Sequence, residues 1–224
     1  MLTANEAFEK TLVVNEIRLT IQGESTYVGR LCALVRLAGC PQACRYCDTP
    51  EAHAFNAGET LTIGEILEKV EAFGCDLVEI TGGEPLAQPA SADLAACLLD
   101  RGFEVLVETS GSHPIDALPP QVVKIMDLKC PSSGESERNE FSNIERLSSR
   151  DEVKFVIADR GDYEWACAVV REQGLAGRCE VFFSPAFGLL EPQRLAEWIV
   201  ADRMPVRLQI QLHKYVWGPD AKGV

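Results

Sequence analysis

An apolar run leads directly into three closely spaced cysteines in the stretch Leu31-Cys-Ala-Leu-Val-Arg-Leu37-Ala-Gly-Cys40-Pro-Gln-Ala-Cys44-Arg-Tyr-Cys47. Its first part, Leu31–Leu37, is almost wholly apolar and predicts a buried strand. Three thiols then follow within eight residues, a spacing at which a short loop can wrap a metal centre. The stretch therefore predicts a strand that opens at its carboxyl end into a metal-binding loop.

Similar apolar runs predict further strands at 76–81, 103–108, 122–128, 152–157, 179–184 and 207–212. Between several of them lie patterns at helical spacing, at 63–73, 91–101, 162–173 and 192–201. The first of these is preceded by Thr62 and Glu65 as a capping box and followed by Gly74. Strands alternating with helices predict an α/β fold with a mostly parallel sheet, either an open doubly wound sheet or a barrel.

The unusual segments fall where the predicted strands end. They are the cysteine loop and residues 81–85, 108–111 and 127–134. In both architectures the carboxyl edge of the sheet carries the active site. Residues 129–150, rich in Ser, Glu and Arg, are the best candidate for a mobile loop, and a solvated surface insertion is at least as well supported there as an active-site lid.

Composition places the chain among globular proteins and limits its partners. It has 224 residues, 46% hydrophobic, and no division by a linker, which predicts one domain over residues 1–224. No apolar run is long enough to span a membrane, and residues 1–10 lack a signal-peptide pattern, so we expect a cytoplasmic protein without a membrane partner. A net charge of −13 also argues against a nucleic-acid partner.

The spacing of the nine cysteines favours an iron-sulfur cluster. A zinc site or a conventional cluster normally takes a fourth ligand from a second motif, and the other cysteines are scattered singly, at Cys32, Cys75, Cys97, Cys130, Cys167 and Cys179. We expect these six to be buried structural residues. Three clustered thiols without a fourth suggest a four-iron cluster with one open iron, and the alternatives are a zinc loop or three unrelated core thiols.

Two motifs resemble the radical S-adenosylmethionine superfamily: the C-x3-C-x2-C loop with Tyr46 before its last cysteine, and Thr81-Gly82-Gly83-Glu84-Pro85. Alone, the second would be an ordinary turn. The resemblance implies a partial TIM-like βα barrel, a 4Fe-4S cluster held by Cys40, Cys44 and Cys47, and S-adenosylmethionine on its open iron. It also implies contacts to that cofactor from Gly83, Glu84, Glu108, Asp127, Leu128 and Lys129.

Four further features resemble the 7-carboxy-7-deazaguanine synthase family. They are Ile21-Gln22-Gly23-Glu24, Arg36, Asp48-Thr49 and the tail Leu212-His213-Lys214-Tyr215-Val216-Trp217-Gly218. The resemblance implies that 6-carboxy-5,6,7,8-tetrahydropterin becomes 7-carboxy-7-deazaguanine with loss of ammonia, after a 5'-deoxyadenosyl radical takes and later returns a hydrogen. It implies that the pterin is bound by Ile21, Gln22, Gly23, Glu24, Arg36 and Thr81, with Arg36 on its carboxylate and Thr49 on Mg²⁺.

Without the resemblance, Arg36 would be a strand-end surface residue and Thr49 a turn or helix cap. Two positions depart from the family pattern: Ser25 stands where many relatives have Gly, and Val224 ends the chain where some relatives end in a substrate-binding proline. The family further implies a flavodoxin-like electron donor and a homodimer. The alternatives are a glycyl-radical activating enzyme and a zinc-stabilised binding module, and neither His53 nor His113 is assigned a role.

Overall fold

Nine strands form one sheet in the part of the chain that the computed structural model describes, residues 4–219, 221 and 223. Their order is β3-β1-β2-β4-β5-β6-β7-β8-β9. The strands are β1 (Thr11–Ile21), β2 (Leu31–Leu37), β3 (Glu59–Thr62), β4 (Leu77–Gly82), β5 (Glu104–Thr109), β6 (Val123–Asp127), β7 (Glu152–Ile157), β8 (Glu180–Pro185) and β9 (Arg207–Leu208). Since β3 and β9 each pair on one side only, the barrel is incomplete, as predicted.

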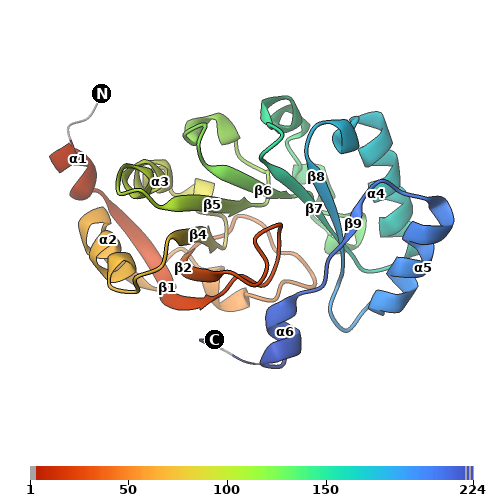
Figure 1. Ribbon diagram of the computed structural model, residues 1–224, viewed down its shortest axis with the longest axis horizontal. Coiled ribbons are helices and arrows are strands. Elements are labelled where there is room, and N and C mark those ends of the chain that lie inside the picture. Colours follow the sequence, from red (N-terminus) through yellow and green to blue (C-terminus); the bar gives the residue numbers. More distant parts are fainter. Residues whose placement is uncertain (1–3, 220, 222, 224) are drawn as a thin grey trace.

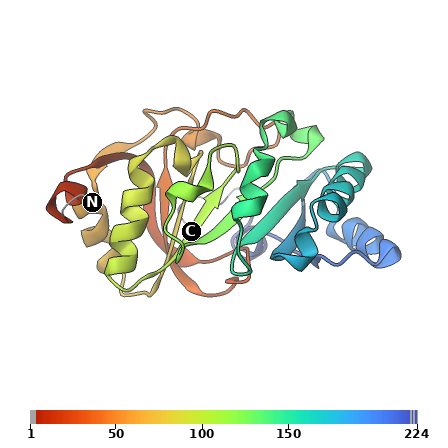
Figure 2. The ribbon, with the colours of Figure 1, turned by 90° about the horizontal axis from the view of Figure 1, so that it is seen from above.

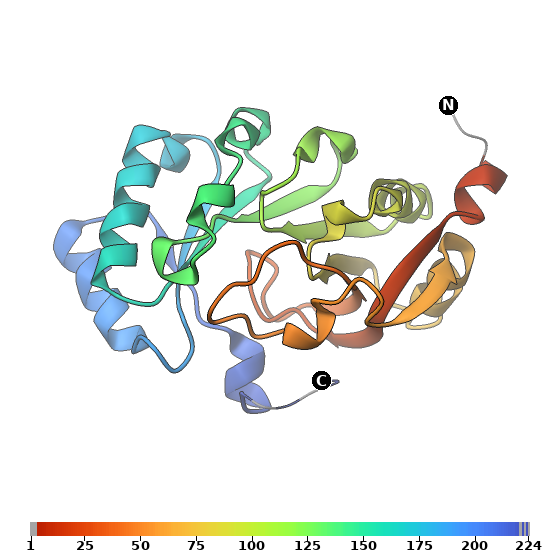
Figure 3. The ribbon, with the colours of Figure 1, turned by 180° about the vertical axis from the view of Figure 1, so that it is seen from behind.

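Neighbouring strands are parallel along the order β2-β4-β5-β6-β7-β8-β9, whereas β1 is antiparallel to both β2 and β3. The α-helices are α1 (Ala4–Phe8), α2 (Ile63–Glu71), α3 (Ala90–Asp100), α4 (Arg160–Glu172), α5 (Pro192–Asp202) and α6 (Leu212–Val216). Figures 1 and 3 show α2 to α5 along the outer side of a curved sheet, and the segment between β2 and β3 together with α6 on its inner side. Seen from above, the chain progresses from one end of the sheet to the other, as its colours show (Figure 2).

The apolar face of each outer helix forms the core with the strands beneath it. In α2 the buried residues are Ile63, Ile66, Leu67 and Val70, at the spacing that the sequence predicts. Thr62 and Glu65 form the predicted capping box, in which each side chain accepts from the other residue's backbone N–H. Two large buried clusters result, one over β1 to β5 and one over β6 to β8.

The inner side of the sheet changes character along the strands. Near their amino ends a small apolar cluster fills the curve, made of Cys32, Leu77, Leu106, Val123 and Ile125. Closer to the carboxyl ends, the same faces carry charged or polar residues, which are Arg36, Glu79, Thr81, Glu108 and Asp127. The sheet therefore closes its amino end with a small core and leaves a polar lining at its carboxyl edge.

Three expectations differ from the structure. Strands β1 and β3 have no counterpart among the predicted strands, and the run 207–212 is a strand only over Arg207–Leu208 before α6 begins. Residues 129–150 are not irregular throughout, because they form the 3₁₀ turns η4 (Pro131–Ser133), η5 (Ser136–Arg138) and η6 (Phe141–Arg146) with Asn143 and Ile144 buried, although many of their positions are exposed as in a surface insertion. Within the described part, no helix has the length and apolar character needed to cross a bilayer.

Candidate active site

The three cysteines of the motif lie on the inner side of the sheet, on the segment between β2 and β3. Each is a free thiol and is partly exposed. Three contacts tie the loop to the opposite half of the sheet: the Ala43 N–H donates to Glu135 Oε1 at 3.0 Å, the Arg45 N–H to the Ser133 carbonyl at 3.0 Å, and the Tyr46 hydroxyl to the Val156 carbonyl at 3.1 Å. The aromatic residue of the motif therefore anchors the loop to the end of β7.

Burial disfavours the thiolate forms of these cysteines unless nearby positive groups or N–H donors offset the negative charge on sulfur. Burial raises the pKa of Cys40, while the Gln42 backbone N–H lowers it. Burial raises the pKa of Cys44 to about 11, and the Lys129 ammonium opposes this rise. A backbone donor and a cation thus already face the sulfurs that a metal would hold as thiolates.

The geometry fits a cluster better than a single ion. Among the described residues, no three His, Cys, Asp or Glu side chains are placed to hold one metal ion. In an iron-sulfur cluster each thiolate binds a different iron, so three neighbouring thiols need not converge on one point. The donor set of Cys40, Cys44 and Cys47 therefore fits a 4Fe-4S cluster.

The Gly-Gly-Glu segment packs directly against the start of the cysteine loop. The Glu84 N–H donates to the Gly39 carbonyl at 2.8 Å, and a Cβ added to Gly83 would lie 2.4 Å from that same oxygen. Only glycine permits this approach. The carboxylate of Glu84 is fully buried and accepts from Leu86 N, Thr109 Oγ1 and both donors of Ser110, all at 2.6 to 2.9 Å.

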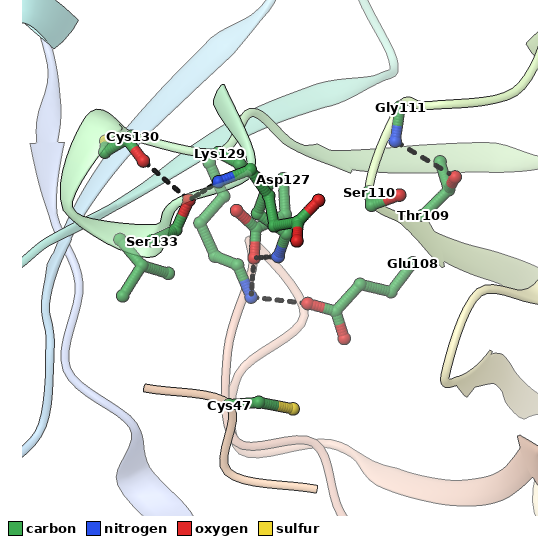
Figure 4. A network of polar contacts seen from close by, with 12 residues as sticks. Cys47, Glu108, Thr109, Ser110, Gly111, Asp127, Lys129, Cys130 and Ser133 are labelled. Carbon is green, nitrogen blue, oxygen red and sulfur yellow. Dashed lines mark hydrogen bonds and ion pairs between the residues drawn. The ribbon is translucent and has the colours of Figure 1, made fainter. Parts of the chain in front are cut away.

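That buried carboxylate fastens the end of β4 to the end of β5. All four of its donors belong to the protein, so its predicted contact with the cofactor amino group stays a prediction, as does that of Gly83. Leu128 is also fully buried, and its N–H donates to the Lys154 carbonyl at 2.9 Å. Figure 4 shows Thr109, Ser110 and Gly111 at the end of β5, with the Gly111 N–H bonded to Thr109 Oγ1.

A buried lysine that the sequence prediction did not include occupies the centre of the polar lining. Lys154 on β7 donates to Glu24 at 3.0 Å and to Glu108, and its Nζ lies 3.8 Å from Asp127. Burial alone would lower the pKa of Lys154, but these carboxylates raise it well above its usual value. Lys129 donates to the same Asp127 oxygen at 2.9 Å, and Figure 4 shows Glu108, Asp127 and Lys129 over the loop that carries Cys47.

Arg36 and Thr81 lie side by side on the same lining. They are paired in register on β2 and β4, and Thr81 Oγ1 donates to Glu108 at 3.2 Å. The Arg36 side chain is only 15% exposed, and its Nε lies 3.9 Å from Glu16. Arg36 is therefore not the strand-end surface residue of the alternative reading, because it is largely buried beside Thr81, another predicted substrate residue.

The Gln22-Gly23-Glu24 segment follows Ile21 at the end of β1 and forms the seat of α6. The Leu212 N–H donates to the Gly23 carbonyl at 3.0 Å, and a Cβ on Gly23 would lie 2.3 Å from His213 Nδ1. Glu24 accepts from Gln211 at 3.0 Å as well as from Lys154. The tail motif and the Gln-Gly-Glu motif, far apart in sequence, thus form one wall.

The Ser25 substitution is less neutral than the sequence suggests. Its φ is 66°, in the left-handed region that favours glycine. The Ser25 hydroxyl accepts from the Tyr27 N–H at 3.1 Å, which stabilises the turn. The serine therefore adopts the conformation of a glycine and adds a hydrogen bond.

Thr49 and Asp48 follow the last cysteine. Thr49 precedes the 3₁₀ turn η1 (Pro50–Ala52), but its hydroxyl makes no capping hydrogen bond, so the cap of the alternative reading is absent. Burial would raise the pKa of Asp48, yet Lys214 and Gln211 hold it well below its usual range. Thr49 thus directly follows a firmly ionised residue in the sequence, and its hydroxyl lies 3.7 Å from Cys47 Sγ.

Glu79, another residue that the sequence prediction did not include, lies under this wall on β4. Burial, with the charges of Glu108 and Glu24, raises its pKa to about 8. A lysine or a glutamate inside an otherwise apolar predicted strand is the signal that could have identified Lys154 and Glu79. Of the scattered cysteines, Cys32, Cys97, Cys130 and Cys167 are buried and Cys75 and Cys179 half-buried, while the terminal Val224 lies outside the described residues.

Known proteins match both the sequence and the fold. Residues 34–127 match the family model described as Radical SAM superfamily. A 7-carboxy-7-deazaguanine synthase of Chlorobaculum tepidum is 48% identical over 96% of this chain and 99% of its own, and one of Koribacter versatilis is 42% identical over 94% and 99%. The crystal structure of QueE from Escherichia coli, 23% identical, superposes with a TM-score of 0.77 over 95% of this chain and 100% of that one.

Proposed function

Because the chain belongs to the 7-carboxy-7-deazaguanine synthase family of the radical SAM superfamily, we propose that it converts 6-carboxy-5,6,7,8-tetrahydropterin to 7-carboxy-7-deazaguanine with loss of ammonia. The observation that carries the proposal is the meeting of four segments at one edge of the sheet. The cysteine loop, the Gly-Gly-Glu segment, the Gln-Gly-Glu segment and the tail helix all face the same charged lining. A radical enzyme needs a site that orients its substrate and excludes water.

The enzyme uses a 4Fe-4S cluster and S-adenosylmethionine, as its superfamily does. Cys40, Cys44 and Cys47 hold the cluster, and together the two groups supply a 5'-deoxyadenosyl radical. The protein's part is to position and to balance charge. Asp127 Oδ1 is buried without a hydrogen-bond partner among the described residues, so it is available to a cofactor hydroxyl or ammonium.

Substrate recognition rests on the inner lining of β2, β4 and β5. Arg36 pairs with the pterin carboxylate, for which its planar guanidinium provides two parallel donors. Thr81 binds a polar edge of the ring, with Glu108 beside it as a contact to the cofactor, and Ile21, Gln22 and Gly23 contact the ring through the segment that seats α6. Buried Gln22 Nε2 has no partner in the described structure, which supports a donor role toward the pterin.

Magnesium belongs beside the last cysteine. The Thr49 hydroxyl makes no capping hydrogen bond, and the residue before it is the ionised Asp48. Mg²⁺ prefers oxygen ligands and keeps several waters, which Asp48 and Glu24 can accept hydrogen bonds from. We expect the pterin carboxylate to complete this coordination.

The remaining proposals concern partners and location. We propose a single domain in the cytoplasm, with no nucleic-acid or membrane partner. A flavodoxin-like electron donor docks on the cysteine-loop side, where Arg45 is exposed and the Arg138 side chain is 57% exposed. Such a donor is acidic and this chain has a net charge of −13, so the docking surface must offer local cations. We also propose a homodimer, for which the exposed apolar neighbours Tyr215 and Val216 of α6 offer a contact surface, and sedimentation in solution tests it.

The test is anaerobic reconstitution with iron and sulfide, followed by dithionite, S-adenosylmethionine, Mg²⁺ and carboxytetrahydropterin, with products identified by mass spectrometry. We expect 7-carboxy-7-deazaguanine from the wild type and none from Cys44→Ala. Cys97→Ala, a matched cysteine change on the outer side of the sheet, should retain activity. A brown protein that makes 5'-deoxyadenosine but no deazapurine would contradict the substrate and revive the glycyl-radical alternative, whereas a colourless zinc protein would contradict the radical class.

A further inference from the structure

His53 is the residue at which the cysteine loop closes on itself. The loop returns through η1, where the Gly39 N–H donates to the Ala52 carbonyl at 2.7 Å and the Cys40 N–H donates to the His53 carbonyl at 3.0 Å. The backbone of His53 is therefore fixed against the first cysteine of the motif. Its side chain points to the last: Nε2 lies 3.1 Å from Cys47 Sγ.

Cys47 differs in this respect from the other two cysteines. Among the described residues, it is the one member of the motif with a side-chain nitrogen within hydrogen-bonding distance of its sulfur. The neighbouring Thr49 hydroxyl is 3.7 Å from the same sulfur. Phe55 lies against Gly39, where an added Cβ would be 2.4 Å from its ring, so the segment after His53 also covers the start of the loop.

The geometry points to His53 as a positioning residue that donates its Nε2–H to the Cys47 thiolate and thereby raises the reduction potential of the cluster. This inference rests on the proposed function, since it needs the cluster to be present. An iron-bound thiolate has no proton, so the ring must supply the one that lies between nitrogen and sulfur. Hydrogen bonds to cluster sulfurs withdraw electron density and stabilise the reduced, more negative state.

The contact favours this role over a simple structural one. A histidine needed only to close the loop would do so through its backbone carbonyl, which any residue has. The ring instead contacts a ligand atom of the proposed cluster. With one of three sulfurs hydrogen-bonded by a side chain, the ring gives the protein a local control on how readily the cluster accepts the electron that starts each turnover.

The experiment is an EPR-monitored redox titration of the reconstituted holoenzyme, carried out on the wild type and three variants. His53→Phe removes the donor and keeps a ring of similar size, His53→Gln restores an N–H donor, and His113→Phe is the matched control at a histidine that contacts Ser112. We expect His53→Phe to make reduction less favourable by up to about tenfold, equivalent to about 59 mV for one electron. His53→Gln should recover much of that shift, and His113→Phe should show none.

Iron and sulfide analysis of the same samples separates the possible outcomes. Four irons per chain in every variant, with a shifted potential only in His53→Phe, supports the proposal. An unchanged potential in His53→Phe overturns it, and so does a loss of iron from that variant, which would make the ring a ligand or a structural latch. A wild type that fails to assemble a four-iron cluster contradicts the proposed function itself.

Discussion

The two faces of the same strands carry different kinds of residue. Facing the helices, Val35, Ile80 and Val107 are wholly or almost wholly buried in one apolar cluster. One residue further along each strand, facing the inside of the curve, stand Arg36, Thr81 and Glu108. Strand alternation alone separates them.

The difference teaches where each property of the protein resides. Hydrophobic burial on the outer face stabilises the fold through many similar contacts, so no single residue decides it. The inner face carries buried charges whose desolvation is compensated only by one another. We therefore expect outer substitutions to change stability without changing chemistry, and inner substitutions to change both.

The largest effect should follow from Lys154→Met. It leaves Glu24, Glu108 and Asp127 without the buried cation that they share, which should lower the free energy of unfolding by about 3–5 kcal/mol and abolish turnover. Urea denaturation and the product assay measure the two effects. The double variant Lys154→Met/Glu108→Gln should regain part of the stability, and additive losses would show that the charges are not coupled.

Sequence reasoning found the outer face more readily than the inner one. The predicted strands 31–37 and 152–157 coincide with β2 and β7, and the capping box of α2 is present as predicted, because local patterns decide these features. Strand β1 was missed because Asn15, Glu16 and Arg18 interrupt its apolar run, and a bulge near Glu16 breaks its alternation. Its pairing with β2 and β3 supplies what its own pattern lacks.

The site was predictable as a set of segments but not as a set of partners. Motif resemblance located the cysteine loop, Arg36, Thr81 and the Gln-Gly-Glu segment, and the structure brings them to one edge. Lys154 contacts Glu24 and Glu108, which lie 130 and 46 residues away in the sequence. Such contacts depend on how the strands pair, which no local sequence pattern indicates. The same holds for Glu84, whose four donors come from three other residues.

A substitution on the outer face tests the other half of the comparison. Ile80→Ala removes a fully buried side chain from the cluster beneath α2 and α3, which should lower the free energy of unfolding by about 3 kcal/mol. Because Ile80 points away from the lining, the rate per folded molecule should stay close to wild type. If that rate instead falls as far as in Lys154→Met, the two faces are not separable.

The ionisation of Glu79 should make stability depend on pH in a direction opposite to that of an ordinary salt-bridged carboxylate. Its pKa is raised by burial, and further by Glu108 and Glu24, from 4.5 to about 8, so the folded protein keeps a proton that the unfolded chain releases. The contribution that protonated Glu79 makes to the free energy of unfolding is therefore complete below pH 4.5 and is lost as the pH rises toward 8.

Glu79→Gln removes this dependence. Urea denaturation at pH 6 and pH 8 should show the wild type losing on the order of 2 kcal/mol more than the variant between the two conditions. Gln should also preserve the shape of the neutral side chain. Parallel losses in both proteins would mean that Glu79 is already ionised at pH 6 in the folded state.

The smallest expected effect lies at the edge of the outer layer. In Thr62→Ala the capping box of α2 loses its side-chain acceptor for the Glu65 N–H and one partner of the Glu65 carboxylate, which should cost about 1 kcal/mol. Urea denaturation measures the loss, and Thr62→Ser, which keeps the hydroxyl, is the matched control. Turnover should be unchanged in both variants, because the cap lies on the helical side of the sheet. Thr62 also belongs to β3. A loss of activity in Thr62→Ala alone would therefore show that α2 influences the inner lining through that strand.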